Sequence, residues 1–233
     1  MMDRTLKAFS LVLGYPTREL QRAMPEISSV ILSDTRLTTL SRRKIEPLLE
    51  LLATDDIYDL EERYVLLFDR SRTLSLNLFE HVHGESRDRG GAMVSLLETY
   101  RDGGFEPATS ELPDHLPVLL EFLALSSLSE ARKTLADAAH ILDALAVRLS
   151  RRESPYAAVF AALLEIAGVK RDEAAVSGLL SEPDDDPNDL NALDQVWEES
   201  EVIFGPDPNA GCPQVRDMLA NMDPPANPEF AAE

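Results

Sequence analysis

The chain has 233 residues, of which 44% are apolar and 6% aromatic, and it carries a formal net charge of −20. This acidity argues against binding to nucleic acid or to anionic membrane surfaces, because such binding gains affinity from Lys and Arg that neutralise phosphates. The single cysteine, Cys212, excludes an internal disulfide bond, and the apolar stretches are too short or too interrupted by charge to predict a signal peptide or a membrane span, so we expect a cytoplasmic protein.

Leu and Ala dominate the composition while β-branched residues are scarce, which favours helix over strand. We therefore expect an all-α protein with one bundle-like domain, residues 1–181, of roughly eight or more helices.

The first half of this domain predicts four helices, each with apolar side chains at helical spacing after a residue that can cap the start. They are a stripe from Leu6 to Leu13 that ends at Gly14; a helix capped by Thr17 that runs to Ile31 and is kinked at Pro25; residues 41–53; and a helix capped by Asp55 that runs to Leu67.

The second half predicts four more. They are a helix capped by Ser86 that ends at Asp102; a helix capped by Asp114 that runs to Leu125; a helix from Ser129 to Leu149; and a helix that starts at Ser154 and Pro155. The third of these is expected to be continuous, because its apolar residues recur at spacings of three and four without a break from Ala131 onwards.

Residues 182–233 have a different composition, with fourteen acids against one base and eight of the fifteen prolines. They predict an acidic, proline-rich tail with one short helix near residues 189–203, around Trp197, that docks on the body. Two roles are open for the tail: a solvating chain, or a ligand that competes intramolecularly for a groove that binds basic peptides.

The stretch LFEHVHGESRDRGG, Leu78 to Gly91, is dense in charge and holds two of the four histidines. The preceding TLSLNLF alternates apolar and polar residues, which predicts an extended run with His81 and His83 on one side. Together with His115 they would suit a metal-dependent hydrolase, but no strands support such a site and two arginines would lie beside the metal. We prefer a recognition loop and expect neither metal ligands nor catalytic residues.

A second dense stretch is ELPDHLPVLLEF. Asp114 is well placed to cap a helix, with His115 at its head, and we expect this helix head and the EHVHGESRDR loop to line one polar-rimmed groove. His140 lies off the apolar stripe and is expected at an edge. No nucleophile motif and no phosphate-binding glycine loop is present, so we do not expect an enzyme.

In these two stretches, with an early LGYP and a late VWEESEVIFGPD, the sequence resembles the nitrate reductase molybdenum cofactor assembly chaperones of the NarJ type, a group of helical redox-enzyme maturation chaperones. The resemblance implies a cytoplasmic chaperone without a cofactor that binds the immature catalytic (alpha) subunit of respiratory nitrate reductase through its N-terminal segment. It would keep that subunit competent for molybdenum cofactor insertion and then dissociate. Molybdenum cofactor biosynthesis proteins are a further class of partner that the resemblance allows.

A helical groove lined by leucines can take the apolar face of an amphipathic peptide, while acids at its rim select basic residues. The residues expected at this groove are Glu80, His81, His83, Glu85, Arg87, Arg89, Asp114, His115 and Glu121. Titration of the histidines would make peptide affinity vary between about pH 6 and 8. A helical adaptor that binds a peptide without assisting assembly is the alternative within the binding class.

Overall fold

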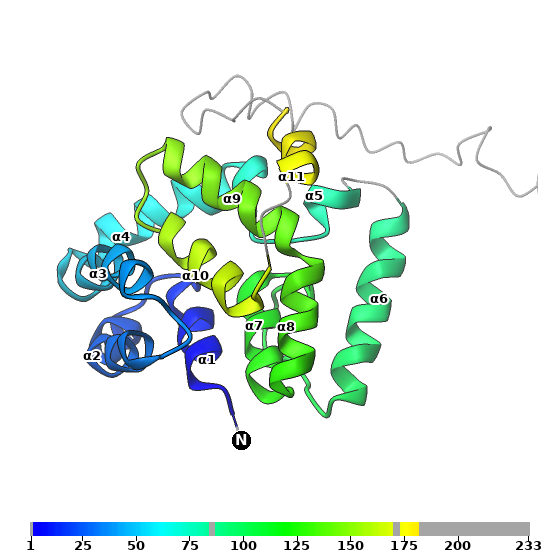
Figure 1. Ribbon diagram of the computed structural model, residues 1–233, viewed down its shortest axis with the longest axis horizontal. Helices are drawn as coiled ribbons and strands as arrows, with labels where there is room; N and C mark the ends of the chain where they lie inside the picture. The colour runs from blue at the N-terminus through cyan, green and yellow to red at the C-terminus, as the bar shows by residue number, and fades with distance from the viewer. Residues whose placement is uncertain (1, 84–86, 170–172, 182–233) are drawn as a thin grey trace, which may run out of the picture. The chain divides into compact units, whose positions relative to one another are not determined.

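The structure is a computed structural model that describes residues 2–83, 87–169 and 173–181, all within the first of two compact units, Met1–Asn188. Within these residues the chain forms eleven α-helices and no β-strand, which confirms the predicted all-α fold (Figure 1). The second unit, Asp189–Glu233, and with it the predicted helix near residues 189–203, lies outside the described residues.

The helices are α1 (Arg4–Val12), α2 (Arg18–Ser33), α3 (Thr39–Thr54), α4 (Ile57–Tyr64), α5 (Glu80–His83), α6 (Arg87–Asp102), α7 (Leu116–Leu125), α8 (Leu128–Asp137), α9 (Ala139–Arg151), α10 (Ala157–Ala167) and α11 (Glu173–Leu180). A π-helical turn, η1 (Val65–Asp69), continues α4, and a 3-10 turn, η2 (Arg72–Leu74), follows it.

The start of α1 is joined to the end of α2 through Arg36. The Asp3 carboxylate caps α1 by accepting hydrogen bonds from the backbone of Thr5 and Leu6 at 3.1 and 3.2 Å. Arg36 donates to Asp3 at 2.9 Å and to Asp34, the C-cap residue of α2, at 3.0 Å. Burial alone would raise the pKa of Asp34, but the Arg36 hydrogen bonds hold it at about 2.

Helix α1 packs on α7, more than 100 residues later in the chain. The backbone N–H of Asp3 donates to the carbonyl of Ala124 at 2.7 Å, and Lys7 pairs with Glu121. The hydroxyl of Ser10, which is buried, donates to the carbonyl of Pro117 at 2.8 Å. Glu121 therefore stabilises the contact between α1 and α7.

The continuous helix predicted from Ser129 to Leu149 is wrong, because the chain bends at Ala138 and forms α8 and α9. Ala138 has φ −88° and ψ 2°, and its carbonyl accepts from Leu142 at 3.1 Å, which starts the new helix. Leu135 and Leu142 on either side are both fully buried. The apolar spacing thus continues across the bend and could not reveal it.

Helix boundaries differ from the prediction in smaller ways. Asp56 rather than Asp55 caps α4, by accepting from the backbone N–H of Tyr58 at 2.9 Å, while Asp55 ends α3. Helix α3 starts at Thr39, two residues before the predicted start. Ser86, the predicted cap of α6, lies outside the described residues.

Helix α11 was not predicted, and it is joined to the body by a buried arginine. Arg148 of α9 is only 2% exposed, and it donates to the carbonyl of Thr73 at 2.9 Å and to that of Leu179 at 2.6 Å. These bonds attach the end of α11 to η2 and α9.

Candidate functional site

The two charged motifs lie side by side. An isolated antiparallel bridge pairs Asn77 with His115, and the backbone N–H of Leu78 donates to the carbonyl of Asp114 at 3.1 Å. The segment before the first motif is thus anchored on the head of α7. Although the first motif ends at Gly91 and the second begins only at Glu111, the two share one side of the fold.

The extended run ends before the histidines, so the predicted placement of His81 and His83 on one side is wrong. Both lie in α5, where residues two apart project about 200° apart. His81 Nε2 is 2.8 Å from the carbonyl oxygen of Ser75, while the His83 ring packs edge-on against Phe79 with centroids 5.9 Å apart. Among the described residues no group of three or more His, Cys, Asp or Glu could hold a metal ion.

Asp114 does not cap α7 as predicted; His115 occupies the cap position and makes no side-chain hydrogen bond there. Asp114 is 1% exposed, and its Oδ2 instead accepts from the backbone N–H of Phe79 at 3.0 Å. The Nη2 atom of Arg89, in α6, lies 4.0 Å from the same oxygen. The carboxylate therefore links α5 and α6 to the head of α7.

The imidazole of His115 is largely enclosed. Burial lowers the pKa of His115, and this outweighs the opposite effect of the Glu111 and Asp114 carboxylates. The ring therefore takes up a proton at lower pH than a free imidazole does. The pH dependence of peptide affinity between about pH 6 and 8 stays a prediction.

A cavity of about 300 Å³ opens beside the two motifs. Its walls come from α5, α6, α7 and the bend between α8 and α9, and most of them are apolar. The lining residues are Leu78, Phe79, Val82, His83, Leu96, Asp114, Leu119, Thr134, Asp137, Ala138, His140 and Ile141. His140, predicted at an edge, thus belongs to the cavity wall, and it does so because of the bend at Ala138.

A second cavity of about 760 Å³ lies between the C-terminal end of α6 and helices α7 and α8. It shares Thr134 and Asp137 with the first, and its lining also includes the acids Asp102 and Glu130. Figure 1 shows α6 standing beside α8, with α5 at one end of it. We call the two cavities together the α6 trough; one half is apolar and the other is polar and acidic.

Only part of the predicted site lies in this trough. His83 and Asp114 line it, while Glu80 pairs with Arg72 at 3.8 Å and Glu121 pairs with Lys7 away from it. His81, His115 and Arg89 are not among the residues that line the two cavities. Glu85 and the side chain of Arg87 lie outside the described residues.

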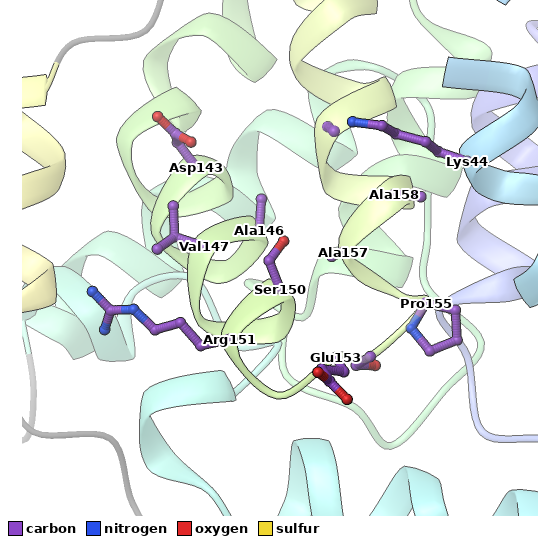
Figure 2. A pocket seen from close by; sticks show the side chains of 12 residues that line it. Lys44, Asp143, Ala146, Val147, Ser150, Arg151, Glu153, Pro155, Ala157 and Ala158 are labelled. Carbon is purple, nitrogen blue, oxygen red and sulfur yellow. The ribbon is translucent and has the colours of Figure 1, made fainter. Parts of the chain in front are cut away.

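Another cavity, of about 740 Å³, lies between α9 and α10 and contains no residue of either motif (Figure 2). Its walls are built mainly from small side chains such as Ala146, Ser150 and Ala157, with Lys44 of α3 on one side. The sequence did not indicate this cavity, because a run of alanines on two helices is equally typical of close packing.

Residues 34–162, more than half of the chain, match the family model described as nitrate reductase delta subunit, and both charged motifs fall within the match. The chain belongs to the nitrate reductase delta subunit family. None of the described helices of this family member is long and apolar enough to cross a lipid bilayer.

Relatives within the delta subunit family cover most of the chain. The nitrate reductase molybdenum cofactor assembly chaperone NarJ of Escherichia coli K12 is 43% identical over 204 residues, which are 87% of this chain and 85% of NarJ. NarW of the same strain, named for the same role, is 38% identical over 89% of this chain and 86% of its own. Bacillus subtilis NarJ is 34% identical over 71% of this chain and 91% of its own.

The fold also resembles that of a solved structure, a protein from Archaeoglobus fulgidus described as a redox enzyme maturation protein. The TM-score is 0.51, at 23% identity, over 72% of this chain and 95% of that one. At this level of identity, the likeness shows that the two proteins share a fold and nothing beyond it.

Proposed function

We propose that this protein is an assembly chaperone that binds the immature catalytic subunit of respiratory nitrate reductase in the cytoplasm. It recognises the N-terminal segment of that subunit, keeps it competent for molybdenum cofactor insertion, and is not part of the finished enzyme. The observation that carries the proposal is the 43% identity with E. coli NarJ over 87% of the chain. The chaperone binds without catalysing a reaction.

The α6 trough is the proposed binding groove. Its apolar half can receive the apolar face of a helical segment, and its other half offers the carboxylates of Asp102 and Asp137 to basic residues. Glu130 lines the same half but is engaged by Ser127, and Lys133 is the one base among its described lining residues. The net charge of −20 adds long-range attraction for a basic segment. Size, shape and charge thus favour an amphipathic, basic helix.

The proposed contacts differ from those expected from the sequence. We assign contact with the client to Phe79, Val82, His83, Asp114 and His140, which line the apolar half. Glu80, His81 and Glu121 already have partners within the body, so we assign them to holding the walls in place.

Calorimetric titration with a synthetic peptide of the first residues of the catalytic subunit tests the groove. Val82 is 53% exposed and lines the trough, so we expect Val82→Glu to weaken binding by at least about tenfold, since it places a charge on an apolar wall. Val94 is 57% exposed on α6 and does not line the trough, so Val94→Glu is the matched control. A peptide with reversed charges should not bind. Equal affinities for both variants would contradict the groove.

Reconstitution separates the chaperone from a helical adaptor that merely binds. The cofactor-free catalytic subunit is incubated with molybdenum cofactor, with and without this protein, and its molybdenum content and nitrate reductase activity are measured. The chaperone should raise both. Peptide binding without any gain in molybdenum would support the adaptor. A hydrolase finds no support in the geometry, because His81, His83 and His115 do not converge.

A further inference from the structure

The carboxylate of Asp114 is buried with incomplete partners. Its side chain has no exposed area, and Oδ1 accepts no hydrogen bond from any described residue. Its other oxygen, Oδ2, accepts one hydrogen bond from the described part of the chain, that of the Phe79 backbone N–H. A buried carboxylate is stabilised by several donors or by a closely paired cation, so Asp114 retains unused capacity to accept.

The cation beside it is also poorly matched. Arg89 Nη2 lies 4.0 Å from Asp114 Oδ2, beyond hydrogen-bonding distance, and the buried Nε atom of Arg89 has no partner among the described residues. A well-formed arginine and carboxylate pair makes two parallel bonds at about 2.8 Å. The Arg89 side chain therefore balances the charge of Asp114 but does not supply the hydrogen bonds that its carboxylate oxygens can accept.

Asp114 lines the apolar half of the α6 trough, where Phe79, Val82 and Leu96 provide apolar surface around it. A lysine or arginine side chain suits this arrangement, because its aliphatic stem can lie on apolar walls while its charged head reaches a carboxylate. The cavity of about 300 Å³ has room for one such side chain and a neighbouring apolar residue.

We propose that Asp114 is a cation-binding site for one basic side chain of the client, and that Arg89 is an internal competitor that occupies this site in the free protein. The client cation displaces Arg89 from Asp114 and makes the hydrogen bonds that Arg89 does not make. This assignment rests on the proposed function and changes the role of Arg89 from a client contact to a residue that opposes binding.

The exchange also acts on α6. Arg89 lies in the first turn of this helix and is followed by Gly90 and Gly91. Among the described residues, no atom outside the helix's own backbone and the adjacent residues lies within 4 Å of where their Cβ atoms would stand. At the other end α6 is held by Tyr100, whose hydroxyl donates to the carbonyl of Pro113 at 2.7 Å. Displacing Arg89 therefore releases the first turn of α6 while Tyr100 keeps its last turn in place, which widens the apolar half of the trough.

The two residues are predicted to have opposite effects on affinity. Arg89→Gln removes the competitor and should tighten binding of the basic client peptide by about tenfold, if Arg89 occupies the site in about nine free molecules of ten. Asp114→Asn keeps an acceptor for the Phe79 N–H but removes the charge, and should weaken binding by about tenfold or more. The double variant should bind like Asp114→Asn, since the competitor has nothing left to occupy.

Arg101→Gln is the matched control, because it removes the same charge from an exposed position near the other end of α6. It should change affinity by less than about twofold. Weaker binding by Arg89→Gln would show that Arg89 contacts the client, and an unchanged affinity would show that it does not occupy Asp114; either result overturns the proposal. Circular dichroism checks that each variant is folded, and Arg89→Lys, with a shorter reach, provides a milder second variant that should tighten binding less.

A probe that does not depend on the client separates this inference from the proposed function. Pentylguanidinium and pentylamine carry the expected chemistry, and their binding can be followed by NMR at the Phe79 amide in the wild type, Arg89→Gln and Asp114→Asn. We expect shifts that saturate at lower concentration in Arg89→Gln and disappear in Asp114→Asn. Such shifts without client binding would contradict only the proposed function, whereas client binding with no effect of either substitution would contradict only the inference.

Client peptides with acetylated and free N-termini distinguish a side chain from the terminal amine as the source of the cation.

Discussion

Asp114 and His115 are neighbours with different tasks at the head of α7. The carboxylate receives the backbone N–H of Phe79 and lines the trough, while the imidazole is enclosed and its pKa is lowered by burial. From the sequence, both residues are expected at the polar rim of the groove. Their burial leaves no signal in the sequence, because it depends on the distant segment around Asn77 that pairs with them.

His115 should make the fold sensitive to mild acid. The folded protein binds a proton at His115 less readily than the unfolded chain does, because the imidazole in the unfolded chain has a pKa of about 6.5. Its contribution to stability is therefore complete above that pH and is lost as the pH falls through the lowered folded value. Urea denaturation at pH 7.5 and 5.5 should show a smaller loss of unfolding free energy for His115→Gln than for the wild type and for the control His140→Gln. Equal losses in all three would contradict this expectation.

At the scale of elements, most helices were predictable because they rest on local signals. Thr17 caps α2 by accepting from the backbone of Leu20, and Gly168 ends α10 in the left-handed conformation with φ 71°. The wrong predictions concern places where contacts between segments distant in the sequence determine the local structure. Helix α5 replaces the predicted extended run once the Asn77–His115 bridge is made, and the bend at Ala138 carries no glycine or proline to signal it.

Substitutions at two glycines, Gly91 near the start of α6 and Gly103 just after its end, test separately what stabilises each end of this helix. In Gly91→Ala the new methyl group meets no described residue outside its own helix within 4 Å, so the higher helix propensity of alanine should stabilise the protein by about 0.5–1 kcal/mol.

In Gly103→Ala the Cβ would lie 2.6 Å from Cε2 of Phe122, a ring that packs on Tyr100 with centroids 4.8 Å apart. Displacing that ring should cost about 1–3 kcal/mol and loosen the C-terminal end of α6. Thermal and urea unfolding of both variants measure the difference. A neutral Gly103→Ala would mean that Tyr100 and Phe122 do not hold this helix.

At the scale of the molecule, the core is formed by residues between Leu6 and Val176, from α1 to α11. The predicted boundary between a folded body and the acidic residues 182–233 follows from composition, because these residues hold most of the excess negative charge. This boundary stays a prediction, as does the role of the tail in competing for the groove.

A chain that ends at Ser181 should fold on its own. It keeps the described core and the bond between Arg148 and the carbonyl of Leu179, so we expect helical circular dichroism and a Tm within about 4 °C of the full chain. Titration of both proteins with the client peptide then tests the tail: tighter binding by the shorter chain would support competition, and equal affinity would support a solvating role. A much lower Tm would place the boundary later in the chain.

The pairing of α1 with α7 has a consequence for synthesis. Helix α1 ends at Val12 and its partner begins at Leu116, so at about 5–20 residues per second the ribosome completes α1 roughly 5 to 20 seconds before α7 is available. During this interval the side of α1 that packs on α7 lacks its final cover. A substitution on that side can thus reduce the yield of protein in the cell without changing the stability of the molecules that finish folding, and the two quantities need separate measurement.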